Sequence, residues 1–273
     1  MKQKHTLDND DAQVGRILSR REVLAFLGGS SAALLAACTP GALTSVSPTA
    51  TNQQTSSAAA TAAAASSATA ATVLPSCIVR PALTEGPYFV DEKLSRSDIR
   101  SDPGTGALRP GALLTLNFLV SRVSGSACTA LSGAVVDVWH CDALGVYSDV
   151  QDPGGNTVGQ KFLRGYQTTD GEGLARFTTI YPGAYRGRAV HIHFKVRAAA
   201  AGGRVHDFTS QLFFDDALSD QVYAQPPYAG RADQRLRNAR DGIYRNAGAQ
   251  LTLAVTPAAP GYAATFELAL ETG

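Results

Sequence analysis

Short segments in which apolar and polar residues alternate dominate the chain from residue 112 onward, and they constrain its fold more than any other feature. Because side chains alternate between the two faces of a strand, such segments predict half-buried β-strands. Turns rich in Gly, Pro and Asp, such as "DPGTG" and "DGEG", separate them. The predicted strands cover residues 112–123, 133–141, 174–180, 188–196, 208–214, 251–255 and 264–270. The pattern predicts an all-β fold, an antiparallel β-sandwich with long loops and few short helices.

The beginning of the chain has a different character. "SRREVL" carries paired arginines, an apolar stretch follows, and "LAAC" ends it at Cys38. This is the order of an export signal, and the apolar stretch is too short and too rich in Gly and Ser for a transmembrane helix. "SRREVL" resembles the twin-arginine signal, whose pathway exports folded proteins. We therefore predict a twin-arginine-type export signal over residues 1–38.

Cys38 lies in a sequence that resembles a lipobox, so we expect it to become the lipidated first residue of the mature protein. The alternative is an ordinary signal cysteine that is cleaved away. Residues 39–74 are rich in Ala, Ser and Thr and predict a disordered linker. The expected location is therefore periplasmic or at the cell surface as a lipoprotein, or secreted.

Residues 75–273 remain for the folded part, and at that length we expect one domain. The formal net charge of +1 gives no reason to expect a nucleic acid as a partner. Three cysteines lie in this part: Cys77, Cys128 and Cys141. In an exported protein they predict one disulfide and one free thiol, and the sequence leaves open which two pair. The oligomeric state is open as well.

Two histidines share one face of a predicted strand. In "RAVHIHFKV", His191 and His193 are two residues apart, so both side chains point the same way, about 7 Å apart along the strand. Neutral imidazole is the commonest protein ligand of metals, so the pair predicts a metal site, whereas the alternative is a hydrogen-bonded pair. Only His140 and His206 remain in the folded part. We expect His140 to be structural and His206 to lie in a loop.

A site with more than two protein ligands must therefore recruit another residue type, and tyrosine is the candidate. Tyr185 ends the turn "PGAY", and Tyr147 follows the turn in "WHCDALGVYSD". A tyrosine beside a trivalent cation can ionise. Two tyrosinates and two imidazoles form a hard, anionic set of ligands that prefers Fe(III) to Zn(II) or Cu(I).

The runs "GAVVDVWHCDALGVYSD", "FLRGYQTTDGEGLARFTTIYPGAYRGRAVHIHFKV" and "SQLFF" together resemble the intradiol ring-cleavage dioxygenases, the group of catechol 1,2-, hydroxyquinol and protocatechuate 3,4-dioxygenases. The resemblance covers roughly residues 76–216. It implies that one non-haem ferric ion per chain is bound by Tyr147, Tyr185, His191 and His193. In the family, the residue that corresponds to Tyr185 is the tyrosinate that the substrate displaces.

The resemblance extends to the substrate pocket. It implies that Arg188 lies beside the substrate and that Gln211 accompanies it. "LTEGPYF" resembles the loop that lines the pocket in this family, although an ordinary turn is the alternative. The pocket residues implied by this loop are Thr84, Gly86, Pro87 and Tyr88. Arg186 stands where some relatives carry an aromatic residue, which puts the transfer of a substrate from relatives in doubt.

The function implied is cleavage of catechol-type rings between the two hydroxylated carbons with O2, giving muconate-type diacids. The expected partners are a small aromatic diol and O2. Two alternatives belong to other classes: a Zn- or Cu-dependent hydrolase that uses His191 and His193, and an exported β-sandwich that only binds. Metal identity and colour distinguish the iron dioxygenase from the zinc hydrolase, because a zinc protein is colourless.

Overall fold

The computed structural model describes residues 77–125, 127–152, 155–185 and 187–271. The predicted export signal, Cys38 and the linker lie outside the described residues. Within the described part, no helix is long and apolar enough to span a membrane. The helices in the described part are α2 (Asp216–Tyr223), α3 (Gly242–Ala247) and four short 3-10 helices at Ala201–Gly203, Ala229–Gln234, Asn238–Arg240 and Gly248–Leu251.

Most of the described elements are strands. They are β1 (Leu113–Ser124), β2 (Ala127–Ala130), β3 (Val135–Trp139), β4 (Gln151–Asp152), β5 (Gly155–Asn156), β6 (Arg164–Thr168), β7 (Leu174–Ile180), β8 (His191–Ala199), β9 (Val205–Phe213), β10 (Thr256–Ala258) and β11 (Gly261–Glu271).

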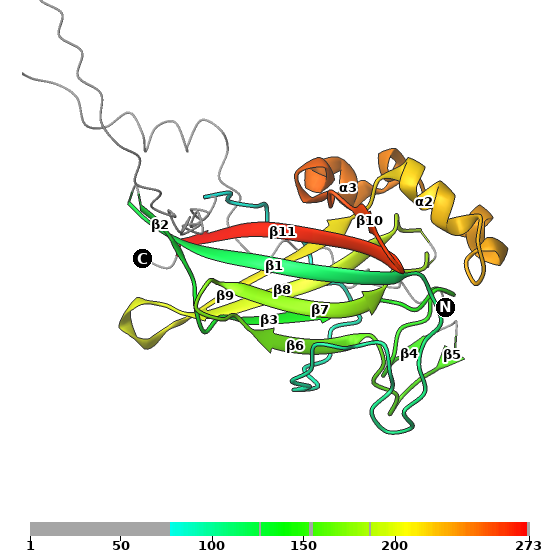
Figure 1. The fold of residues 1–273 in the computed structure, drawn as a ribbon, viewed down its shortest axis with the longest axis horizontal. Coiled ribbons are helices and arrows are strands. Elements are labelled where there is room, and N and C mark those ends of the chain that lie inside the picture. The colour runs from blue at the N-terminus through cyan, green and yellow to red at the C-terminus, as the bar shows by residue number, and fades with distance from the viewer. Residues whose placement is uncertain (1–76, 126, 153–154, 186, 272–273) are drawn as a thin grey trace, which may run out of the picture. The chain divides into compact units, whose positions relative to one another are not determined.

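Two sheets form a sandwich, which confirms the predicted fold class (Figure 1). One sheet has the order β10-β11-β1-β2, with β7 also paired to β1, and the other has the order β6-β3-β8-β9. β4 and β5 form a separate two-stranded ribbon. β1 and β11 run parallel, so the first sheet is mixed, whereas the alternating pattern predicted antiparallel pairing throughout. Figure 1 shows α2 and α3 together at one end of the sandwich.

The core lies between the sheets and fixes which way the histidines of β8 point. The ring of Phe194 lies 5.2 Å from that of Phe118 and 5.4 Å from that of Phe266, which belong to the opposite sheet. Because side chains alternate along a strand, His191 and His193 extend from the other face of β8, away from this core. The site therefore lies on the outer face of the β6-β3-β8-β9 sheet, where loops cover it.

Several predictions of local structure are wrong. Residues 251–255 alternate as a strand does, but only Thr252 forms an isolated bridge, with Phe213, and β10 begins at Thr256. His206 lies in β9, not in a loop, because this strand begins at Val205. The alternating pattern also missed β2 and β6.

The open question of cysteine pairing is answered by the disulfide between Cys77 and Cys128, whose Cα atoms are 5.7 Å apart. It fastens the first described residue to β2. Cys141 is free and buried, and its thiol donates a hydrogen bond to the carbonyl of Gly183 at 3.3 Å. The expected single disulfide and single thiol are both present.

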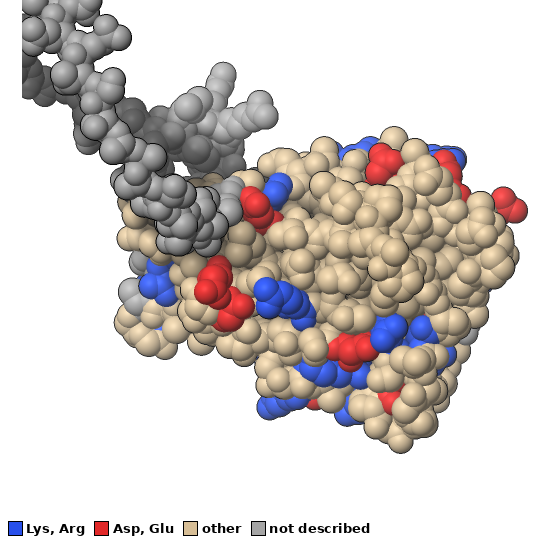
Figure 2. All heavy atoms as spheres, viewed as in Figure 1, with Lys and Arg blue, Asp and Glu red and all other residues tan. Residues whose placement is uncertain are grey.

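The surface carries both signs of charge. Figure 2 shows acidic and basic side chains close to one another around a broad area without charge, which lies over the outer face of the β11-β1 sheet. This view contains no extended patch of a single sign.

Candidate active site

The two histidines of β8 meet at their ring nitrogens. The Nε2 atoms of His191 and His193 are 3.1 Å apart, and both side chains are buried. The Nδ1 of His191 lies 2.7 Å from the carbonyl oxygen of Ala189, which can only accept, so Nδ1 carries the proton and Nε2 presents a lone pair. Burial lowers the pKa of both imidazoles well below its usual value, so both are neutral.

Neighbouring strands hold the ring of His193. Trp139 is its register partner on β3, and the two rings stack with centroids 5.1 Å apart and planes inclined by 9°. Gln211 is its register partner on β9. The buried Trp139 therefore forms a wall of the site.

Two tyrosines complete a cluster around the histidines. The ring of Tyr185 lies 5.4 Å from that of His191 and 5.4 Å from that of Tyr147, and Tyr147 lies 6.3 Å from His193. Burial raises the pKa of Tyr147 well above its usual value. It also raises the pKa of Tyr185, although the nearby charge of Arg188 opposes that shift. The structure thus brings all four predicted ligands together.

Close contact between two turns explains how the tyrosines meet. Gly145 has a φ of +82°, and a Cβ there would lie 2.2 Å from the carbonyl oxygen of Ala184. A Cβ on Gly183 would lie 2.3 Å from the carbonyl oxygen of Asp142. Only glycine permits such an approach of backbone to backbone. The two glycines therefore bring the turn before Tyr147 against the turn before Tyr185.

A buried arginine, Arg164, holds the backbone next to Tyr147 through hydrogen bonds. Arg164 is 2 % exposed and donates to the carbonyl oxygen of Ser148 at 2.6 Å, to the hydroxyl of Ser148 at 2.9 Å and to the carbonyl oxygen of Tyr88 at 2.6 Å. It therefore joins the residue after Tyr147 to the loop of Tyr88. Before the structure, the only trace of this role was an arginine that follows the apolar pair of Phe162 and Leu163.

Arg188 lies at the edge of the cluster, where its guanidinium reaches several groups. Nη2 donates to Oε1 of Gln211 at 2.6 Å, and Nη1 lies 3.3 Å from the hydroxyl of Tyr185 and 3.4 Å from Nε2 of His191. Nε donates to Oδ2 of Asp241 at 3.0 Å. Arg188 and Gln211 therefore share one site, as the resemblance implied, while Asp241 was not singled out.

The predicted pocket loop covers the cluster. A Cβ on Gly86, whose φ is +72°, would lie 3.1 Å from Cε1 of His193. The ring of Tyr88 stacks on that of Tyr147 with centroids 4.3 Å apart, and the carbonyl of Thr84 accepts from Gln211 at 2.9 Å. Pro87 is exposed. Three of the four predicted pocket residues thus contact the cluster or the residues beside it.

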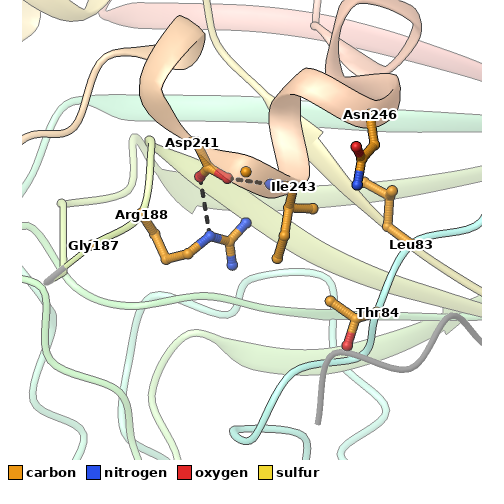
Figure 3. A pocket seen from close by; sticks show the side chains of 8 residues that line it. Leu83, Thr84, Gly187, Arg188, Asp241, Ile243 and Asn246 are labelled. Atoms are coloured by element: carbon orange, nitrogen blue, oxygen red, sulfur yellow. Dashed lines mark hydrogen bonds and ion pairs between the residues drawn. The ribbon is translucent and has the colours of Figure 1, made fainter. Parts of the chain in front are cut away.

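A cavity of about 360 Å³ opens beside Arg188, between the pocket loop and α3 (Figure 3). Figure 3 shows Arg188 and Asp241 on one side and Leu83 and Asn246 on the other. The residues that line it are Leu83, Thr84, Gly187, Arg188, Asp241, Gly242, Ile243 and Asn246. The cavity is large enough for a small aromatic ring next to the guanidinium of Arg188.

Comparison with known proteins identifies the family. A family model described as Dioxygenase matches residues 84–247. The structure of an intradiol ring-cleavage dioxygenase from Tetranychus urticae superposes with a TM-score of 0.62 and 30% identity, covering 72% of this chain and 96% of that one. The chain belongs to the intradiol ring-cleavage dioxygenases.

Two curated bacterial relatives match part of the chain. The chlorocatechol 1,2-dioxygenase of Pseudomonas putida is 28% identical over 153 residues, which are 50% of this chain and 53% of the relative. The protocatechuate 3,4-dioxygenase beta chain of Burkholderia cepacia is 32% identical over 157 residues, 53% of this chain and 65% of the relative. The chain thus spans about half to two thirds of the length of these relatives.

The residues of the cluster fit the non-haem iron that the family implies. No group of three or more His, Cys, Asp or Glu side chains gathers for a metal within the described residues, which leaves the two tyrosines of the cluster as the candidate further donors. Among the described residues, the buried hydroxyl of Tyr147 has no hydrogen-bond partner, and it lies in the same cluster as the Nε2 atoms of the two histidines, which are within hydrogen-bond distance of each other. Buried polar atoms normally have partners, so this arrangement favours a cation bound among them.

His140 is not part of this set. Its ring nitrogens lie 2.8 Å from the carbonyl oxygen of Cys141 and 2.7 Å from the hydroxyl of Thr179, so both have partners. Burial lowers its pKa to about 4. As predicted, His140 joins neighbouring segments through hydrogen bonds.

Proposed function

We propose that this chain is a non-haem Fe(III) dioxygenase that cleaves catechol-type rings between the two hydroxylated carbons with O2, giving muconate-type diacids. The observation that carries the proposal is the convergence of two neutral imidazoles and two phenols on one buried point, beside Arg188 and an open cavity. Family membership supports the same reaction class.

One ferric ion per chain would be held by Tyr147, Tyr185, His191 and His193. When bound, it supplies Lewis acidity that ionises phenolic oxygens and binds the substrate diol. This mixture of nitrogen and anionic oxygen donors favours Fe(III) over the Zn or Cu of a hydrolase. The histidines need not lose a proton to bind, because burial already keeps them neutral.

Tyr185 has a position suited to accept a proton from the substrate. Its hydroxyl lies 3.3 Å from Nη1 of Arg188, so a tyrosinate at this position would have a positive neighbour. Its oxygen can then take the proton of one catechol hydroxyl as the diol enters. Within the part of the chain that the structure describes, the hydroxyl of Tyr147 has no hydrogen-bond partner, so Tyr147 would be the tyrosine that remains bound to the ion.

Arg188 supplies a fixed positive charge at the ring. A guanidinium stays protonated at every relevant pH. Held by Gln211 and Asp241, it directs Nη1 towards the cluster, where negative charge on the substrate oxygens would develop. Such a preorganised charge lowers the barrier most when the site excludes water. The choice among catechols then depends on the cavity walls formed by Leu83, Ile243 and Asn246.

An isotope experiment tests this proposal. The iron-loaded full chain is incubated with catechol under 18O2, and the products are analysed by mass spectrometry. A ring-opened diacid that carries two labelled oxygen atoms is expected. Arg188→Ala is the comparison variant, which should keep its iron and form product at least 100-fold more slowly. A product cleaved outside the diol, or no product at all, would contradict the proposal.

We also propose export by the twin-arginine pathway and membrane attachment through a lipidated Cys38, with the sequence motifs as support. Cys38→Ala should then move the protein from the membrane fraction to the soluble fraction. An unchanged distribution between the two fractions would contradict lipid attachment.

A further inference from the structure

Asp241 lies buried between Arg188 and α3, with a side chain only 1 % exposed. Its Oδ2 accepts from Nε of Arg188 at 3.0 Å and from the backbone amide of Ala189 at 2.7 Å. Its Oδ1 accepts from the backbone amides of Ile243 at 2.7 Å and Tyr244 at 3.2 Å. One carboxylate thus binds both the segment just before β8 and the first turn of α3.

These contacts set the direction of the guanidinium. Asp241 holds Nε of Arg188, and Gln211 holds Nη2. Since the guanidinium is planar, two fixed donors determine where the third nitrogen points. That nitrogen, Nη1, faces the hydroxyl of Tyr185 and Nε2 of His191. Figure 3 shows the pair of Arg188 and Asp241 at the wall of the cavity, with Ile243 of α3 beside them.

We propose that Asp241 is a positioning residue for ring cleavage. It orients the guanidinium of Arg188 towards the substrate and ties this orientation to the position of α3, which forms a wall of the cavity. The inference rests on the proposed function, because Arg188 is the group through which Asp241 acts. Small displacements of a catalytic group lower turnover strongly, by about 100-fold for 1 Å. Loss of Asp241 should therefore reduce kcat although Asp241 does not itself reach the cluster.

The competing role is that of a helix cap alone, and Asp241→Asn separates the two. Asparagine caps helices about as well as aspartate does. Its amide has only one acceptor oxygen, however, so either Arg188 and Ala189 or the α3 amides must face its NH2 group. Asp215→Asn is the matched control, because Asp215 caps α2 in the same way, through Ala217 and Leu218, without a described contact to Arg188.

The first experiment is a kinetic cycle on the iron-loaded full chain with catechol. Asp241→Asn should lower kcat by about 100-fold, with a smaller change in KM and an unchanged iron content and resting visible spectrum. In an Arg188→Ala background the same substitution should change kcat less than threefold. Asp215→Asn should match the wild type. An unaffected kcat, or losses that multiply in the double variant, would overturn the proposal.

The second experiment needs no turnover. The urea midpoints of the metal-free wild type, Asp241→Asn, Arg188→Ala and the double variant form an unfolding cycle. The two shifts should not add, because the residues contact each other. If the wild type cleaves no catechol, the proposed function and the positioning role fail together, while this cycle still decides whether the coupling exists. Additive shifts would refute the coupling itself.

Discussion

Replacing the buried Arg164 with methionine is expected to destabilise the protein and weaken iron binding together. Methionine fills much of the same volume but donates no hydrogen bond. The substitution would leave the part-buried carbonyl oxygen of Tyr88 and the buried carbonyl oxygen of Ser148 without the donor that each now has in Arg164. Both carbonyls belong to segments that surround Tyr147, so the consequences should reach the metal ligands.

The expected magnitude follows from two opposing effects. A buried acceptor without a donor costs about 1–3 kcal/mol, and because the carbonyl of Tyr88 is only part-buried, about 2–6 kcal/mol is the upper range for the two carbonyls together. Against this, burial lowers the pKa of Arg164, which shows that burying this cation is itself unfavourable, and removing it returns part of the loss. We expect a net decrease of about 3 kcal/mol in the free energy of unfolding.

Urea denaturation of the metal-free protein measures this difference, and titration with Fe(III) measures the affinity. Loss of a residue that orients a metal ligand typically costs 10- to 100-fold in affinity, which we expect here. Arg80→Met is the control, because Arg80 also donates to two carbonyls, of Glu267 and Gln250, and is only half-buried. It should leave iron affinity unchanged. An Arg164→Met variant as stable as the wild type, with normal iron affinity, would refute the reasoning.

Three further predictions address ligation, pH and the disulfide. Tyr147→Phe should bleach the visible band of the iron-loaded protein, and an unchanged spectrum would move the ligand elsewhere. Burial lowers the pKa of His140 from 6.5 to about 4, so at a pH between these values the unfolded chain binds a proton that the folded chain does not. The free energy of unfolding of the metal-free protein should therefore fall by about 2 kcal/mol through this residue between pH 7 and pH 5. Urea midpoints that do not fall over this range would contradict the prediction. Reducing the bond between Cys77 and Cys128, 51 residues apart, should lower the free energy of unfolding by up to about 4 kcal/mol, and equal urea midpoints with and without reductant would argue against that.

The fold was predictable where alternation reflects pairing with a neighbouring strand. The strand prediction failed at residues 251–255, where Leu251 and Leu253 are buried although the segment forms almost no ladder of backbone hydrogen bonds. The amide of Leu253 donates to the carbonyl of Phe213 at 2.9 Å, so the segment lies along β9 and buries every second side chain. Alternation reports burial on one side, and a strand is only one way to produce it.

The candidate site residues were predictable from local motifs, but the residues that hold them in place through long-range hydrogen bonds were not. The His pair and the two tyrosines lie in short runs that resemble the family. Arg164 acts on Tyr88, 76 residues away, and Asp241 acts on Arg188, 53 residues away. Neither contact leaves a periodic or local trace in the sequence. An aspartate before α3 predicts only a helix start.

The visible absorption spectrum of the iron-loaded full chain tests the central claim most directly, recorded without oxygen before and after addition of catechol. A broad tyrosinate-to-iron band that shifts to longer wavelength with catechol is predicted, since Tyr147 would stay bound to the ion while the diol takes the place of Tyr185. A colourless protein that holds zinc in full occupancy and does not respond to catechol would contradict the account.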